Sequence, residues 1–139
     1  MTSTTLTPAA VFDPFHYEVD LPHEIMVNAQ GFRMRVITNS LDVIRTVEES
    51  WAGFPQLFTD HSLEFRVVVS DDQDAKRPST MFSRVHKHLI TTTTDEKDFT
   101  VGDLDRGLAS FWISPASARD QEFLRSYHLH NMMYIMLWQ

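Results

Sequence analysis

The chain has 139 residues, of which 42% are apolar types and 22% are charged, and its formal net charge is −7. These values are typical of one globular domain that can bury its own core. The absence of cysteine excludes a disulfide scaffold, a thiolate metal site and a cysteine nucleophile, and the acidic charge argues against nucleic acid as a general partner.

Residues 1–22 are predicted to form a flexible N-terminal arm, because they begin with a Thr-rich, uncharged stretch over residues 1–10. This stretch lacks the basic start and the long apolar run of a signal peptide. The chain also has no run of about 18 apolar residues, which a transmembrane helix requires. We therefore expect a cytoplasmic protein without membrane association, in which residues 23–139 form a single domain.

Residues 23–37 predict a β-hairpin, because apolar and polar residues alternate on both sides of Gly31. Glycine suits a turn that needs a positive φ. Residues 41–52 predict a helix with one apolar stripe, which Ser40 or Asn39 can cap. A glycine and a proline follow this helix and end it.

Period-two alternation predicts a further strand over residues 63–69, and three later segments are β-prone. These segments are residues 81–89, 90–94 and 99–101. From Asp103 the period becomes helical, because Leu104, Leu108, Phe111 and Trp112 share one face of a helix. Ser114 and Pro115 end this helix and can begin the next one, which is predicted to run from Ala116 to Trp138.

The last predicted helix ends in seven consecutive apolar residues, 132–138. A helix that is apolar all round is normally buried on all sides. We therefore expect the natural chain to continue, so that the domain is truncated at its C-terminal helix; the alternative is a terminal helix that buries itself in a dimer. The order of elements indicates an α+β fold, a mostly antiparallel sheet with helices packed on one face.

Sequence motifs for nucleotide, metal or nucleophilic chemistry are weak. None of the four glycines precedes a lysine in a phosphate-binding loop, so we expect no cofactor within this chain and name no catalytic residue. His86 and His88 would share one face of a strand and could share a metal. The alternative is that both histidines decorate a solvent-exposed face.

Arginines outnumber lysines nine to three. Four of them fall on predicted strands, on the face opposite the core, and would contact an anion or an acidic peptide if their strands were neighbours: Arg33, Arg35, Arg66 and Arg84. The alternative is cross-strand pairing with Glu64 and other acids.

Aromatic residues are frequent in the last third of the chain. They fit either core packing or an interface with a missing domain or a second protomer, where such residues are enriched. The candidate interface residues are Trp112, Phe123, Tyr127, Tyr134 and Trp138.

The order of segments from Gly31 to Gln139 resembles the N-terminal region of bacterial proteins related to HPr kinase/phosphorylase. The resemblance is carried by the segments Phe32–Val36, Trp51–Pro55, Leu63–Val67 and Leu108–Trp112, together with the apolar tail. In that family an α+β domain precedes a P-loop kinase-like core. The Walker A loop, the catalytic acid and the magnesium ligands of that core have no counterpart here.

The resemblance implies a serine kinase or phosphorylase-like activity only for a longer chain. Within it, these residues would supply recognition, docking or dimerisation, through contact with a missing C-terminal domain, a second protomer or an acidic protein segment. The alternative is a freestanding small α+β enzyme or ligand-binding protein that uses a His- and Arg-lined sheet face.

Overall fold

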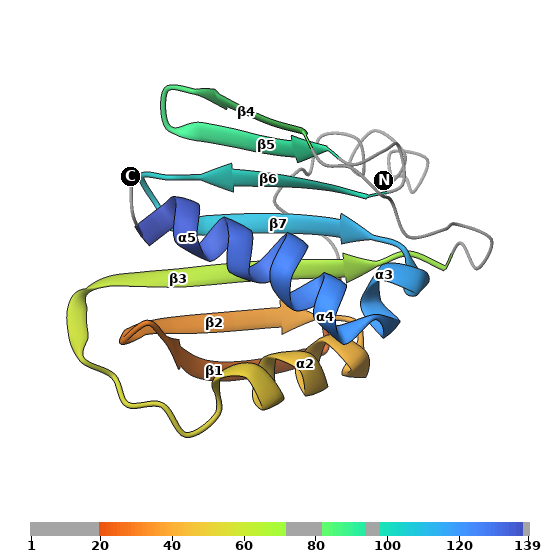
Figure 1. Cartoon of the computed structure of the whole chain (residues 1–139), viewed down its shortest axis with the longest axis horizontal. Helices are drawn as coiled ribbons and strands as arrows, with labels where there is room; N and C mark the ends of the chain where they lie inside the picture. The colour runs from red at the N-terminus through yellow and green to blue at the C-terminus, as the bar shows by residue number, and fades with distance from the viewer. Residues whose placement is uncertain (1–19, 72–81, 94–97, 138–139) are drawn as a thin grey trace, which may run out of the picture.

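The computed structural model describes residues 20–71, 82–93 and 98–137. Seven strands form one sheet in the order β1-β2-β3-β7-β6-β5-β4 (Figure 1). Only the β2–β3 and β3–β7 pairs are parallel, and the other four pairs are antiparallel. The strands are β1 His23–Ala29, β2 Phe32–Thr38, β3 Phe58–Val69, β4 Phe82–His86, β5 Leu89–Thr93, β6 Phe99–Asp103 and β7 Leu108–Ile113.

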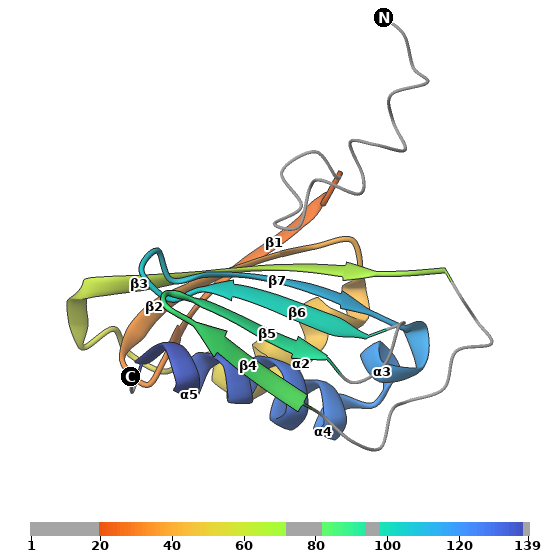
Figure 2. The same ribbon diagram turned by 90° about the horizontal axis from the view of Figure 1, so that it is seen from above.

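All described helices lie on one face of this sheet (Figure 2). No helix of the described residues lies on the other face, which we name the helix-free face. The predicted α+β fold, with a mostly antiparallel sheet and helices on one face, is therefore confirmed. The helices are α2 Leu41–Trp51, α3 Pro115–Arg119, α4 Gln121–Phe123, the π-helix η2 Leu124–His130 and α5 Asn131–Leu137.

The first hairpin and α2 form as predicted. Gln30 and Gly31 both have positive φ, at 54° and 86°, which is typical of a two-residue turn whose twist matches the strands. Ser40 occupies the N-cap position of α2 but makes no side-chain cap hydrogen bond. Asn39 does not cap the helix either, because its side chain donates to the carbonyl of Val69 and accepts from its N–H at 3.0 and 2.9 Å.

The helix predicted from Asp103 to Trp112 is wrong, because these residues form the end of β6, a turn and β7. Strand β7 lies in the middle of the sheet, and both of its faces carry apolar side chains, so period-two alternation is lost. The turn is fixed by Asp103, whose Oδ1 accepts from the N–H groups of Asp105 and Arg106 at 3.1 and 3.2 Å.

The long helix predicted from Ala116 to Trp138 is also broken. Ser114 caps α3 by accepting from the N–H of Ser117 at 3.2 Å, with Pro115 as the first helical residue, as predicted. The chain then leaves the helix at Asp120, whose Oδ1 accepts from the N–H of Phe123 at 3.1 Å and starts a new helix. A second N-cap, made by Asp120 inside an otherwise helical pattern, therefore marks the break.

Helix α5 buries one face rather than its whole circumference. Met132, Met133 and Met136 are buried against the sheet, whereas Tyr134 is 41% exposed. Gly102 on β6 permits this close packing, since a Cβ there would lie 2.8 Å from Ile90 Cγ2 and 3.1 Å from Met132 Sδ.

Candidate functional site

The four candidate arginines share the helix-free face of the sheet but do not form one stripe. Arg33 and Arg35 lie on β2 and Arg66 on the adjacent β3. Arg84 lies on β4, in the same register row as Arg66 but four strands away, about 19 Å at the usual strand spacing. The sheet therefore brings three of these residues together and separates the fourth.

Glutamates occupy two of these arginines, across strands for Arg35 and within β3 for Arg66. Arg35 forms ion pairs with Glu24 and with Glu64, the latter at 3.4 Å, and the hydrogen bond that Arg35 Nε donates to Glu24 raises the pKa of Arg35. Arg66 Nε donates to Glu64 Oε2 at 2.7 Å. The cross-strand pairing considered as the alternative is thus present, and contact with an external anion stays a prediction.

The two candidate metal ligands do not share a strand. His86 ends β4, whereas His88 lies in the tight turn that follows Lys87, a residue with a φ of 57°. Within residues 20–71, 82–93 and 98–137, no three His, Asp or Glu side chains lie where they could hold one metal ion.

The candidate interface aromatics are dispersed over the fold. Phe123 is buried in the core, and Trp112 stacks on Phe99 on the helix-free face at a centroid distance of 6.5 Å. Tyr134 is partly exposed beside His130, with a ring distance of 4.4 Å. Trp138 and the side chain of Tyr127 lie outside the described part of the structure.

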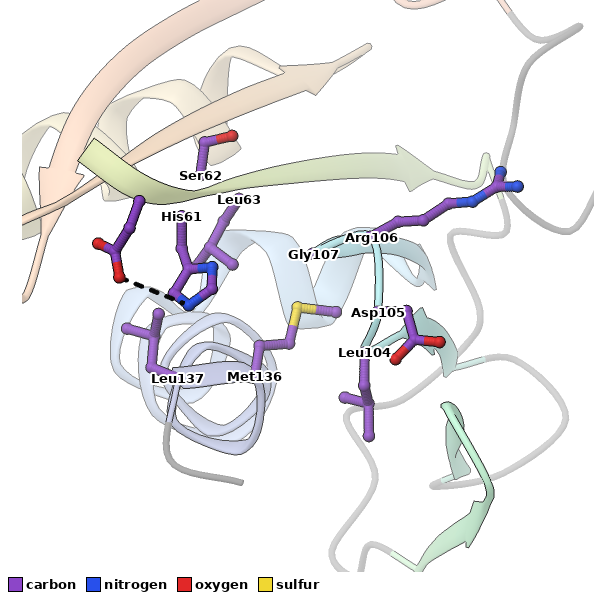
Figure 3. Close-up of a pocket in the computed structure, with 10 residues that line it drawn as sticks. His61, Ser62, Leu63, Leu104, Asp105, Arg106, Gly107, Met136 and Leu137 are labelled. Carbon is purple, nitrogen blue, oxygen red and sulfur yellow. Dashed lines mark ion pairs between the residues drawn. The ribbon is translucent and has the colours of Figure 1, made fainter. Parts of the chain in front are cut away.

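A cavity of about 440 Å³ that sequence patterns did not indicate lies between the start of β3, the β6–β7 turn and the end of α5 (Figure 3). His61 Nε2 is 3.7 Å from Asp60 Oδ2, but both side chains are about 70% exposed, so their mutual attraction is weak. The Arg106 side chain points away from the cavity, and its Nε lies 3.7 Å from Asp103 Oδ2. This cavity therefore presents solvated polar groups over an apolar floor formed in part by Met136 and Leu137.

A second cavity of about 440 Å³ lies beside the C-terminal end of α2. Its lining contains no carboxylate, ammonium or guanidinium group, and its walls are mainly Trp51, Phe54, Leu57 and His130. Burial, together with the charge of Arg125, lowers the pKa of His130 from its ordinary value of 6.5. This shift favours the neutral imidazole, and among the described residues the lining has no other ionisable side chain.

The rim of this second cavity exposes large apolar side chains. Phe54 and Leu57 line the cavity and are 58% and 67% exposed, and Phe58, the next residue after Leu57, is 46% exposed. With Trp51, His130 and Tyr134 they form what we name the apolar end surface. The sequence did not predict this surface, because its residues come from α2, from the loop and strand that follow it, and from the distant helices η2 and α5. The Trp51–Pro55 segment was interpreted as the end of a helix and as part of the family resemblance.

The backbone holds this loop firmly in place. The N–H groups of Leu57 and Phe58 both donate to the carbonyl of Gly31, at 2.8 and 2.9 Å, and Asn28 Nδ2 donates to the carbonyl of Phe54 at 3.0 Å. Gly31 is required at this contact, since a Cβ there would lie 2.9 Å from Leu57 Cβ. The exposed apolar side chains are thus presented by an anchored loop.

Comparisons with known proteins identify no relative: no family model matches the chain, and no curated protein or solved structure matches it. Among the described helices, none combines the length and the apolarity needed to cross a membrane.

Proposed function

We propose that this chain is a non-catalytic recognition domain that docks a protein partner through the apolar end surface. The observation that carries the proposal is the anchored exposure of Phe54 and Leu57, which are more than half exposed although three hydrogen bonds fix their loop. Exposed apolar side chains that are scattered singly need no explanation, but a contiguous group beside a cavity is typical of a binding surface.

The chemistry of the second cavity supports a partner with an apolar anchor. Its lining is uncharged, with Trp51 and a neutral His130 on its walls, so it favours an apolar or aromatic side chain over a charged one. Burying one such anchor contributes about 1.5–3 kcal/mol. We therefore propose that the partner is a protein segment that inserts an aromatic or aliphatic side chain beside Leu57.

The resemblance to HPr kinase/phosphorylase-related proteins extends this proposal. On that basis the partner would be a P-loop kinase core, and the end surface would dock it. The coding sequence that follows Gln139 tests this extension alone. A P-loop encoded there would support a kinase core on the same polypeptide, and a stop codon there would contradict the extension.

The docking proposal is tested by selecting binders from a random peptide library with the full chain. We expect selected peptides to share an aromatic or aliphatic anchor and to lose affinity for the Phe54→Asp and Leu57→Asp variants. Leu41→Asp is the matched control, because Leu41 is 61% exposed at the start of α2, away from the loop that follows this helix.

Calorimetric titration of each selected peptide measures its affinity for the parent chain and for each variant. A tenfold or greater loss of affinity for the Phe54→Asp and Leu57→Asp variants, with unchanged affinity for the Leu41→Asp variant, supports docking at the end surface. Peptides that are rich in acidic residues and bind both loop variants normally would contradict it, and would favour the arginines of β2 and β3.

A further inference from the structure

The two edges of the sheet differ in charge. Within the described residues, β1 and β4 each have a strand neighbour on one side only. Strand β1 carries Glu24 and no lysine or arginine, whereas β4 carries Arg84 and leads into a turn that contains Lys87. Residues 82–93, which form β4, this turn and β5, contain no carboxylate, although the net charge of the chain is −7. We name residues 82–93 the basic hairpin.

The outer strand of the basic hairpin is accessible. No described helix lies over β4 in Figure 1. Val85 is 61% exposed, although it pairs with Ile90, which is only 1% exposed. Arg84, His86 and Lys87 are exposed as well. The side chains along this edge can therefore be reached from solvent.

Strand β4 can hydrogen-bond to a further strand. In an antiparallel pair, alternate residues bond across the pair, and the residues between them direct their N–H and C=O groups away from it. At an edge strand these outward groups can pair with a strand of another polypeptide. Main-chain hydrogen bonds then supply affinity, and the side chains beside the edge select the sequence of the added strand.

The cations of the basic hairpin are not neutralised by their own sheet. Among the described residues, no carboxylate forms an ion pair with Arg84 or Lys87, whereas Arg35 and Arg66 both pair with a glutamate. An added strand that carries carboxylates would supply the missing partner for Arg84, because residues on adjacent strands of one face lie side by side.

The two faces of β4 favour an alternating sequence in the added strand. Arg84 lies on the helix-free face. Val85 lies on the opposite face, because its partner Ile90 pairs in turn with Gly102, against which Met132 of α5 packs. A strand in which carboxylates alternate with aliphatic side chains would therefore match both faces of this edge.

We propose that β4 binds an extended acidic segment of a partner protein, in which carboxylates alternate with apolar side chains. A second copy of this chain fits less well, since both copies carry a net charge of −7. Full antiparallel pairing of two β4 strands would also place the two Arg84 side chains directly opposite each other, which is destabilising. This inference is independent of docking at the apolar end surface, because the two surfaces share no residue.

Titration of the full, isotope-enriched chain, monitored by nuclear magnetic resonance, tests the proposal with synthetic peptides. The first peptide alternates glutamate and valine, and the second is the same peptide with every backbone nitrogen methylated. We expect the first peptide to shift the amide signals of Arg84, Val85 and His86 and to leave that of Ile25 in β1 unchanged. The methylated peptide keeps the charges but has no backbone donor, so it should bind much more weakly. Equal binding of both peptides, or no binding of the first, would overturn the proposal.

Charge reversal locates the contact. Arg84→Glu should weaken the affinity for the glutamate–valine peptide by about tenfold, because like charges would then lie side by side. Arg33→Glu is the matched control, since Arg33 is exposed on the same face of the sheet but lies on β2. If Arg84→Glu fails to fold, Lys87→Glu reverses the second charge of the basic hairpin.

Other occupants of the edge would give different results. An equal loss of affinity in the Arg84→Glu and Arg33→Glu variants would show that the peptide responds to overall charge, and it would overturn binding at β4. Shifts confined to Ile25 and its neighbours would place the added strand on β1 instead. Shifts of the Val85 signal when the chain alone is concentrated would assign the edge to a second copy.

Discussion

His128 Nε2 lies 3.4 Å from Asp98 Oδ2 in the core, where the two side chains are 1% and 0% exposed. Asp98 also accepts from the N–H of Ser114 at 3.1 Å and from Ser117 Oγ at 2.6 Å. One buried carboxylate thus connects the start of β6, the first turn of α3 and the π-helix η2. A buried charge requires such partners, because its desolvation is otherwise very costly.

Replacing Asp98 with Asn should destabilise the fold by about 3–5 kcal/mol, the usual cost of leaving one member of a buried pair uncompensated. Urea denaturation monitored by circular dichroism measures the change. Asp105→Asn is the matched control, since Asp105 is exposed in the β6–β7 turn. Equal stability of the two variants would show that the buried network contributes little.

Gly107→Ala should destabilise the chain by about 1–3 kcal/mol, because alanine is strained at positive φ. Its φ is 65°, and an added Cβ would lie 2.6 Å from the carbonyl oxygen of Ser62. Gly53 provides the comparison, since its φ is 88° but a Cβ there meets nothing within 4 Å. Thermal unfolding should therefore show a larger loss of stability for Gly107→Ala than for Gly53→Ala. The reverse order would mean that the turn does not pack on β3.

Phe54→Asp and Leu57→Asp should each leave the free energy of unfolding within about 0.5 kcal/mol of the parent, because both side chains are mostly exposed. Trp51→Ala should cost about 3–5 kcal/mol, since Trp51 is only 6% exposed. Chemical denaturation compares the three variants. A large loss for either loop variant would mean that the exposed side chains stabilise the fold rather than serve a partner.

The elements that were predicted correctly from the sequence depend on local patterns. The hairpin around Gly31 and the cap at Ser114 depend on neighbouring residues, so composition and spacing were sufficient to predict them. The prediction for residues 108–113 was wrong, because β7 lies in the middle of the sheet. A strand in that position lacks the polar face on which the period-two pattern depends.

The candidate sites depend on contacts between distant segments. Period two placed Arg66 and Arg84 on the same face, but only the strand order shows that three strands lie between them. The second cavity joins Trp51 to His130, and the first joins His61 to Leu137. No local pattern carries such information, so neither cavity could be predicted from the sequence.

The stability of the fold should fall as the pH is lowered through the pKa of His130, because burial and Arg125 lower this pKa in the folded state. The unfolded chain, with its ordinary histidine pKa of 6.5, then binds the proton more readily than the folded chain. The favourable contribution is therefore complete above pH 6.5 and is lost on acidification. A His130→Gln variant isolates this effect, because it removes the imidazole of His130 and leaves every other ionisable side chain in place. Unfolding free energies measured across the acidic range should decline more steeply in the parent than in the variant, and parallel curves would contradict the shift.

Peptides bound at the end surface should also dissociate more readily at acidic pH, since a charged His130 opposes an apolar anchor beside Leu57.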